Sequence, residues 1–176
     1  MRSRMEEGAE RKLYPPQRHG VADAKTWGGG TVLYASGGNF VIELEGCVAV
    51  CSIWARPDVD RQEGARFALA KVDEFKRLLA EPDAVVRSVV LDMTRAPTMW
   101  GPITQSCLER MVAMFDSAGR RVAVVVGSDP LQSQQMQRVV RCYASRHGRI
   151  FGDTAEAIGW ARAAPIPPNG GGIERA

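Results

Sequence analysis

The chain has 176 residues, a length that suits one domain with a sizeable core. Its composition, 45% hydrophobic and 24% charged with a formal charge of +3, is ordinary for a globular protein. The sequence has no apolar run long enough to cross a membrane, and residues 1–12 lack the apolar stretch of a secretory signal. We therefore expect a cytoplasmic protein without a membrane span.

The two ends of the chain are predicted to be flexible and to lie outside the folded domain. Residues 1–38 mix charges, prolines and glycines without a persistent helical or strand period. Within them, Trp27 and residues 32–34 are apolar enough to add a short edge strand. Residues 165–176 carry prolines that would end any helix. The predicted domain accordingly spans residues 39–164.

The domain is predicted to begin with a hairpin and a helix. Residues 40–45 and 47–54 have the apolar character of two strands, and Gly46 joins them. Asp60 and Glu63 have the spacing of a capping box, which favours a helix start at this point. The apolar positions of this helix recur at helical spacing and are Ala68, Val72, Phe75 and Leu79.

Two further pairs of strand and helix follow. Apolar runs occur at residues 85–86 and 89–91, and again at residues 122–126, as expected of strands covered on both faces. Pro102 suits the first turn of the helix between them, Gly119 its left-handed end, and Asp129 the start of the next helix. The predicted apolar faces are Ile103, Cys107, Met111 and Met114 in the first of these helices, and Met136, Val139, Val140 and Tyr143 in the second.

The chain then closes with a short strand at residues 150–151 and a helix. Asp153 and Glu156 form a second capping box in front of that helix. The predicted order is β-β-α-β-α-β-α-β-α, in which strands and helices alternate. Such alternation predicts an α/β fold with a mixed sheet covered by helices.

Three passages within this order are similar to a known family. They are VVLDMTRAP at residues 89–97, GRRVAVVVG at residues 119–127 and IFGDTAEA at residues 150–157. Together with the segment lengths they make residues 39–164 resemble the STAS domain, the fold of bacterial anti-sigma-factor antagonists. The resemblance implies a single STAS-like domain that acts as a non-catalytic protein-interaction module in bacterial regulation and signalling, with a regulatory protein as its partner.

The sequence departs from that family at the loop that carries its switch. Antagonists have an Asp-Ser pair at the start of the helix after the third strand, and a partner kinase phosphorylates the serine. No serine stands in the corresponding stretch here, residues 98–103. Thr98 and Thr104 flank the helix start, where a phosphate would be favoured, but nothing marks either as a modified residue.

Large apolar side chains take the place of the serine. Met99 and Trp100 would anchor a partner if they are exposed, and Trp100 alternatively folds back over the sheet. The predicted partner-binding residues are Thr98, Met99, Trp100, Gly101, Pro102 and Ile103.

Arginines are concentrated in residues 120–149, which contain six of them and one acid. The excess favours an acidic partner or phosphates, or is simply a solvated helix face. The possible charged surface consists of Arg138, Arg141, Arg146 and Arg149. Nucleic-acid binding is not predicted, because aromatic platforms and a recognition-helix pattern are missing.

No catalytic machinery, metal site or cofactor is predicted. The two histidines, His19 and His147, lie in a predicted flexible end and at a helix end, and no hydrolase or phosphate-loop motif occurs. The four cysteines lack metal-site spacing and are interpreted as buried free thiols: Cys47, Cys51, Cys107 and Cys142.

A small-ligand or lipid-binding domain of the Sec14-like kind is the alternative function. In that case methionines would line a pocket between sheet and helices, although methionines also fill gaps in cores. Those methionines are Met93, Met99, Met111, Met114 and Met136. Apolar loop residues and an edge strand also make a homodimer conceivable.

Overall fold

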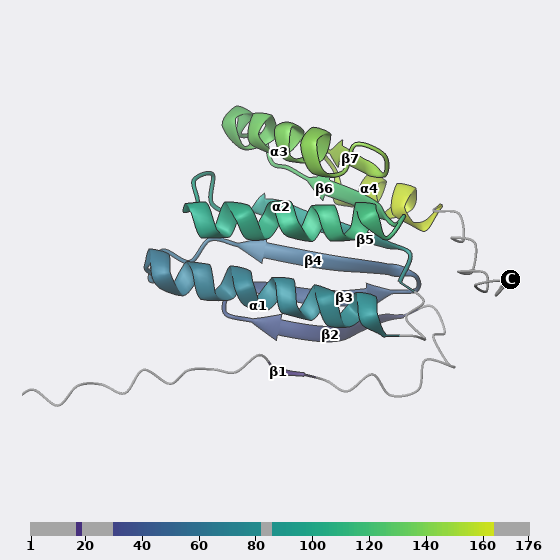
Figure 1. The fold of residues 1–176 in the computed structure, drawn as a ribbon, viewed down its shortest axis with the longest axis horizontal. Coiled ribbons are helices and arrows are strands. Elements are labelled where there is room, and N and C mark those ends of the chain that lie inside the picture. The colour runs from purple at the N-terminus through teal and green to yellow at the C-terminus, as the bar shows by residue number, and fades with distance from the viewer. Residues whose placement is uncertain (1–16, 19–29, 82–85, 164–176) are drawn as a thin grey trace, which may run out of the picture.

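The computed structural model describes residues 17–18, 30–81 and 86–163 as one mixed α/β domain (Figure 1). Its strands are β1 (Gln17–Arg18), β2 (Thr31–Gly37), β3 (Phe40–Glu45), β4 (Val48–Trp54), β5 (Ser88–Arg95), β6 (Arg121–Val125) and β7 (Gly148–Phe151). Its helices are α1 (Arg61–Ala80), α2 (Pro102–Ser117), α3 (Pro130–Tyr143) and α4 (Thr154–Arg162). The predicted α/β class is confirmed, and from β3 onward the predicted order of elements is confirmed too.

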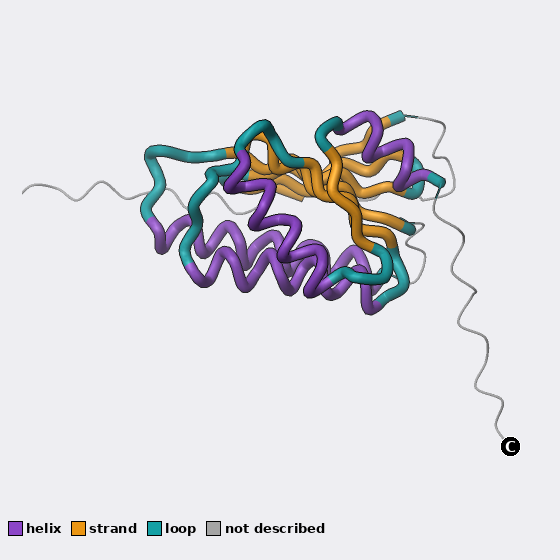
Figure 2. The backbone as a smooth tube through the Cα atoms, turned by 90° about the horizontal axis from the view of Figure 1, so that it is seen from above, coloured by secondary structure: helices purple, strands orange, loops and turns teal. Residues whose placement is uncertain are grey.

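The seven strands lie side by side in the order in which they occur along the chain. Strands β1 to β4 are antiparallel to their neighbours, whereas β4 to β7 are parallel. Because each parallel crossover advances in the same direction, right-handed connections place α1, α2 and α3 on one face of the sheet. Helix α4 covers the opposite face, as Figure 2 shows.

Local capping explains where the helices begin. The side chains of Asp60 and Asp153 accept hydrogen bonds from the backbone N–H groups of Glu63 and Glu156, each at 2.8 Å. Asp129 likewise accepts from the backbone of Leu131 and Gln132. These contacts satisfy amides that have no partner within the helix. The three predicted helix starts are therefore confirmed.

The core consists of two apolar layers separated by the sheet. The larger layer lies under α1, α2 and α3, and in it the rings of Phe75 and Phe115 meet edge to face with centroids 5.4 Å apart. The smaller layer lies under α4. Strand β5 serves both layers, with Val89 and Leu91 in the larger and Val90 in the smaller. This two-sided burial is the reason for its continuous apolar run.

The predicted domain boundary at residue 39 is corrected by β2. This strand pairs with β3 over its whole length, and its Tyr34 and Ala35 are buried in the larger core layer. The folded region therefore begins before the predicted start. Residues 1–16, 19–29 and 164–176, on which most of the two predicted flexible ends fall, lie outside the described residues.

Three further sequence predictions are wrong at single positions. Ile103 and Tyr143, predicted to lie on apolar helix faces, are exposed; Ile103 lies in the first turn of α2 and Tyr143 is the last residue of α3. Cys142, predicted to be buried, is exposed on α3. None of the helices in the described part of the chain is long and apolar enough to cross a membrane.

Candidate functional site

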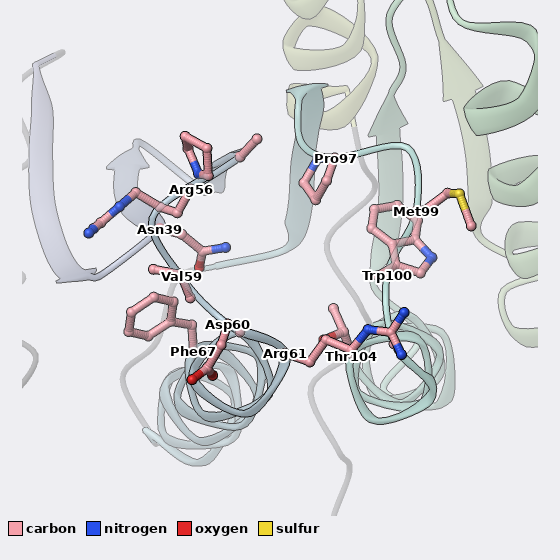
Figure 3. A pocket seen from close by; sticks show the side chains of 14 residues that line it. Asn39, Arg56, Val59, Asp60, Arg61, Phe67, Pro97, Met99, Trp100 and Thr104 are labelled. Atoms are coloured by element: carbon pink, nitrogen blue, oxygen red, sulfur yellow. The ribbon is translucent and has the colours of Figure 1, made fainter.

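A groove lies at the edge of the sheet where β4 and β5 end and α1 and α2 begin (Figure 3). The loop of residues 55–60 forms one wall and the loop of residues 96–101 forms the other. Its volume is about 310 Å³. Its lining includes the side chains of Val59, Arg61, Phe67, Pro97, Trp100 and Thr104.

The wall that contains the predicted partner-binding loop is fixed to the start of α3. The Thr98 hydroxyl donates a hydrogen bond to Asp129 Oδ2 at 2.5 Å, while Oδ1 of the same carboxylate caps α3. The Thr98 hydroxyl holds the pKa of the Asp129 carboxyl below its usual range. Behind the loop, Gln132 Nε2 donates to the carbonyl oxygens of Met93 and Ala96 at 3.0 and 3.4 Å. The loop is therefore held by Asp129 and Gln132, two side chains that were not predicted to contact it.

The two large side chains of the loop differ in their surroundings. Trp100 is partly buried and packs against the larger core layer, so it forms part of the groove wall. Met99 is 80% exposed, and its thioether points away from Phe67 and Val59 on the other wall (Figure 3). Ile103, on the first turn of α2, is 53% exposed. Of these two side chains, only Met99 is therefore exposed enough to anchor a partner.

The start of α2 lacks a capping side chain. Gly101 is its N-cap residue and makes no side-chain hydrogen bond, and Pro102 occupies the first helical position as predicted. Thr104, the second threonine flanking this helix start, lines the groove.

The opposite wall is built on the turn between β2 and β3. Arg56 donates two hydrogen bonds to Asp58, at 2.7 and 2.5 Å, and a third to the carbonyl oxygen of Gly38 at 2.8 Å. The Phe67 ring lies so close to Gly38 that a Cβ there would come within 2.1 Å of it. A side chain at position 38 would therefore displace the Phe67 ring, which lies against the turn.

A buried lysine stands behind this wall. Lys71 is 4% exposed, its Nζ donates to Asn39 Oδ1 at 2.7 Å, and it lies 5.0 Å from the centre of the Phe40 ring. Burial lowers the pKa of Lys71 to about 8. Asn39 lines the groove, so the lysine supports a residue on its surface.

Lys71 is not among the predicted site residues, although the sequence contains a signal for it. The lysine lies three positions after Ala68 and four before Phe75, which places it on the buried stripe of α1. A charged residue in an apolar stripe predicts either a partner inside the protein or a shifted pKa. Here both occur.

The predicted arginine surface is separate from the loop. Arg138 and Arg141 lie on the exposed side of α3, whereas Arg146 pairs with Asp116 at 3.4 Å and Arg149 lies 5.3 Å from the Phe151 ring centre. The loop contacts the start of α3, and Arg146 and Arg149 follow its end. A helix of 14 residues is about 21 Å long. The structure therefore does not bring the two predicted surfaces together.

The residues considered for chemistry are dispersed or used structurally. Asp116 accepts hydrogen bonds from both the backbone N–H and the ring Nδ1 of His147, at 2.9 and 3.1 Å, which fixes the turn before β7. His19 lies outside the described residues. In residues 17–18, 30–81 and 86–163, no three His, Cys, Asp or Glu side chains are arranged to hold a metal ion.

Comparison with known proteins gives a structural likeness but no match to a family. Scans against protein-family models and against curated proteins give no match. Among solved structures, the NMR structure of the protein TM1081 is similar with 16% sequence identity and a TM-score of 0.41. The similarity covers 65% of this chain and 82% of that one.

Proposed function

We propose that this chain is a non-catalytic protein-interaction module of STAS-like type that acts in bacterial regulation. Its binding surface consists of the loop of residues 98–101, the first turn of α2 and the adjoining groove. The observation that carries the proposal is the exposure of Met99 on a loop held in place by the Thr98–Asp129 hydrogen bond.

A rigid loop with an exposed methionine has the physical properties of an interface anchor. Because the loop is already fixed, binding a partner would cost little conformational entropy. Met99 and Ile103 would bury apolar surface, and methionine adapts to the shape it meets. The partner surface would therefore present an apolar pocket or ridge, surrounded by groups that match the polar rim of the groove.

Replacing Met99 by serine is expected to abolish partner binding without unfolding the protein. The side chain makes few internal contacts, so the free energy of unfolding should change by no more than about 0.5 kcal/mol. Affinity capture from lysate of the native cell, with quantitative mass spectrometry, measures retention. Urea unfolding measures stability.

The matched control is Leu69→Ser, which removes another exposed apolar side chain, 48% exposed on α1 and outside the groove lining. A protein retained by the wild type and by the Leu69 variant, and lost with the Met99 variant, supports the proposal. Equal retention by all three chains would refute the assignment of this surface.

The alternative function, binding of a small apolar ligand, is supported by the volume of the groove. About 310 Å³ falls at the lower end of the range for small-molecule sites, which is about 300–1,000 Å³. The position differs from the Sec14-like expectation, because Met93, Met111 and Met136 are buried among core side chains rather than around the groove. Native mass spectrometry of the purified protein would show a bound small molecule that Trp100→Ala releases if this alternative holds.

A further inference from the structure

The register of β1 determines where the preceding part of the chain leaves the sheet. Gln17 pairs with Ser36 and Arg18 with Ala35, in antiparallel orientation. The N-terminal end of β1 therefore lies beside the end of β2 where the β2–β3 turn lies. Phe67 of the groove packs on Gly38 in that turn. The N-terminal end of β1 thus lies at the end of the sheet where the groove is found (Figure 1).

The four residues in front of β1 have the chemistry that an aromatic groove recognises. They read Leu-Tyr-Pro-Pro at positions 13–16, outside the described residues. Consecutive prolines favour the extended polyproline II conformation, which loses little entropy on binding. Grooves lined by aromatic side chains bind such segments. Phe67 and Trp100 provide aromatic surfaces on opposite walls of this groove.

The distances permit this contact. Three strand spacings separate β1 from β4, which is about 14 Å. An extended proline-rich segment advances about 3.1 Å per residue. Phe67, which lies over the nearby β2–β3 turn, is within reach of Tyr14. Trp100 follows β5, four strand spacings or about 19 Å from β1, and an extended segment covers that distance at about residue 11.

We propose that residues 11–16 dock in the groove as an intramolecular ligand, with the Leu-Tyr-Pro-Pro motif of residues 13–16 against Phe67 and residues 11–12 beside Trp100. The segment would cover the groove next to the exposed Met99. A partner that uses the groove as well as the loop would have to displace it. This docking does not depend on the proposed function, because it concerns two parts of the same chain.

A second proline pair in the chain serves as a comparison. Ile-Pro-Pro occurs at residues 166–168, shortly after α4. The end of α4 lies at the opposite edge of the sheet, where Arg162 pairs with Glu45 and the Trp160 carbonyl accepts from Arg121. The end of α4, which this second proline pair follows in the sequence, therefore lies at the far ends of the strands and on the other face of the sheet, away from the groove.

The test compares two variants of the full-length, ¹⁵N-labelled chain by NMR. One carries Tyr14→Ala, Pro15→Ala and Pro16→Ala, and the control carries Ile166→Ala, Pro167→Ala and Pro168→Ala. We expect the first variant to shift the amide signals of Phe67 and Gly101 and the indole N–H signal of Trp100, and the control to leave them unchanged. A synthetic peptide of residues 10–18, added to the first variant, should move these signals back toward their wild-type positions.

Three results would overturn the proposal. Unchanged groove signals in the first variant would show that the segment does not dock there. Changes confined to β2 would show that only the pairing with β1 had been affected. Groove signals of the wild type that change with protein concentration would show that the segment docks in the groove of a second copy instead.

Discussion

Replacing Phe75 by alanine is expected to destabilise the domain by about 3–5 kcal/mol, the typical cost of removing a fully buried phenylalanine from a core. Phe75 is completely inaccessible to solvent, and its ring packs against Phe115. The substitution removes apolar contact and leaves a cavity between α1 and α2. The two loops that form the walls of the groove directly precede these helices. Loss of packing between α1 and α2 is therefore also expected to disturb the groove.

Urea unfolding followed by circular dichroism measures this effect. Phe75→Leu, which retains most of the volume, should cost clearly less. Leu69→Ala on the exposed side of the same helix should cost little, because Leu69 is not part of either core layer. If Phe75→Ala lowered the free energy of unfolding by less than about 1 kcal/mol, the placement of Phe75 in the core would be contradicted, since such a value is typical of partly exposed sites.

The stability of the protein is expected to rise with pH between about 8 and 9 because of Lys71. Burial lowers the pKa of Lys71 from 10.5 to about 8, so above pH 8 the folded state has lost a proton that the unfolded state still holds. The unfolded state then binds more protons, and stability increases with pH. One group of this kind contributes about 1 kcal/mol over that interval.

The expected rise in stability ends near pH 9, because the contribution of Cys51 to stability decreases as the pH rises above that value. Burial raises the pKa of Cys51 from 9.0 to about 12, so its contribution to stability is present below pH 9 and is lost as the pH rises toward 12. Cys107, whose thiol pKa burial also raises, adds to this decrease. The rise due to Lys71 is therefore best measured below pH 9.

The variant Lys71→Met tests the assignment. Urea unfolding at several pH values between 7 and 9 should show the rise in the wild type and its absence in this variant. Lys76→Met, which removes an exposed amine from the same helix, should keep the rise. If Lys71→Met kept it as well, another group would have to be responsible.

The elements of the fold were predictable because their signals are local. Asp60, Asp129 and Asp153 cap helices through contacts with backbone amides two or three residues further along the chain. Gly46 and Gly119 adopt positive φ angles at the turns where the sequence placed them. The runs in β5 and β6 are apolar throughout because these strands are buried on both faces. Each signal involves neighbouring residues, so the sequence carries it.

Strand β2 was only partly predictable. Its central residues are apolar, but it lies between glycine-rich stretches and has no alternating pattern of sufficient length. What stabilises it is pairing with β3 and the burial of Tyr34 and Ala35. Both depend on the rest of the sheet being present.

The sequence by itself determined the α/β class and the helix starts, and it marked the loop at residues 98–103 as a predicted binding surface. Only the tertiary structure decided that Met99 faces outward while Trp100 packs inward, and that Asp129 holds Thr98 from 31 positions away. It also decided that Lys71 is buried against Asn39, and that Phe67 and Trp100 face one groove. These relations join residues far apart in the chain, and a local pattern carries no information about which distant residue will be brought beside it.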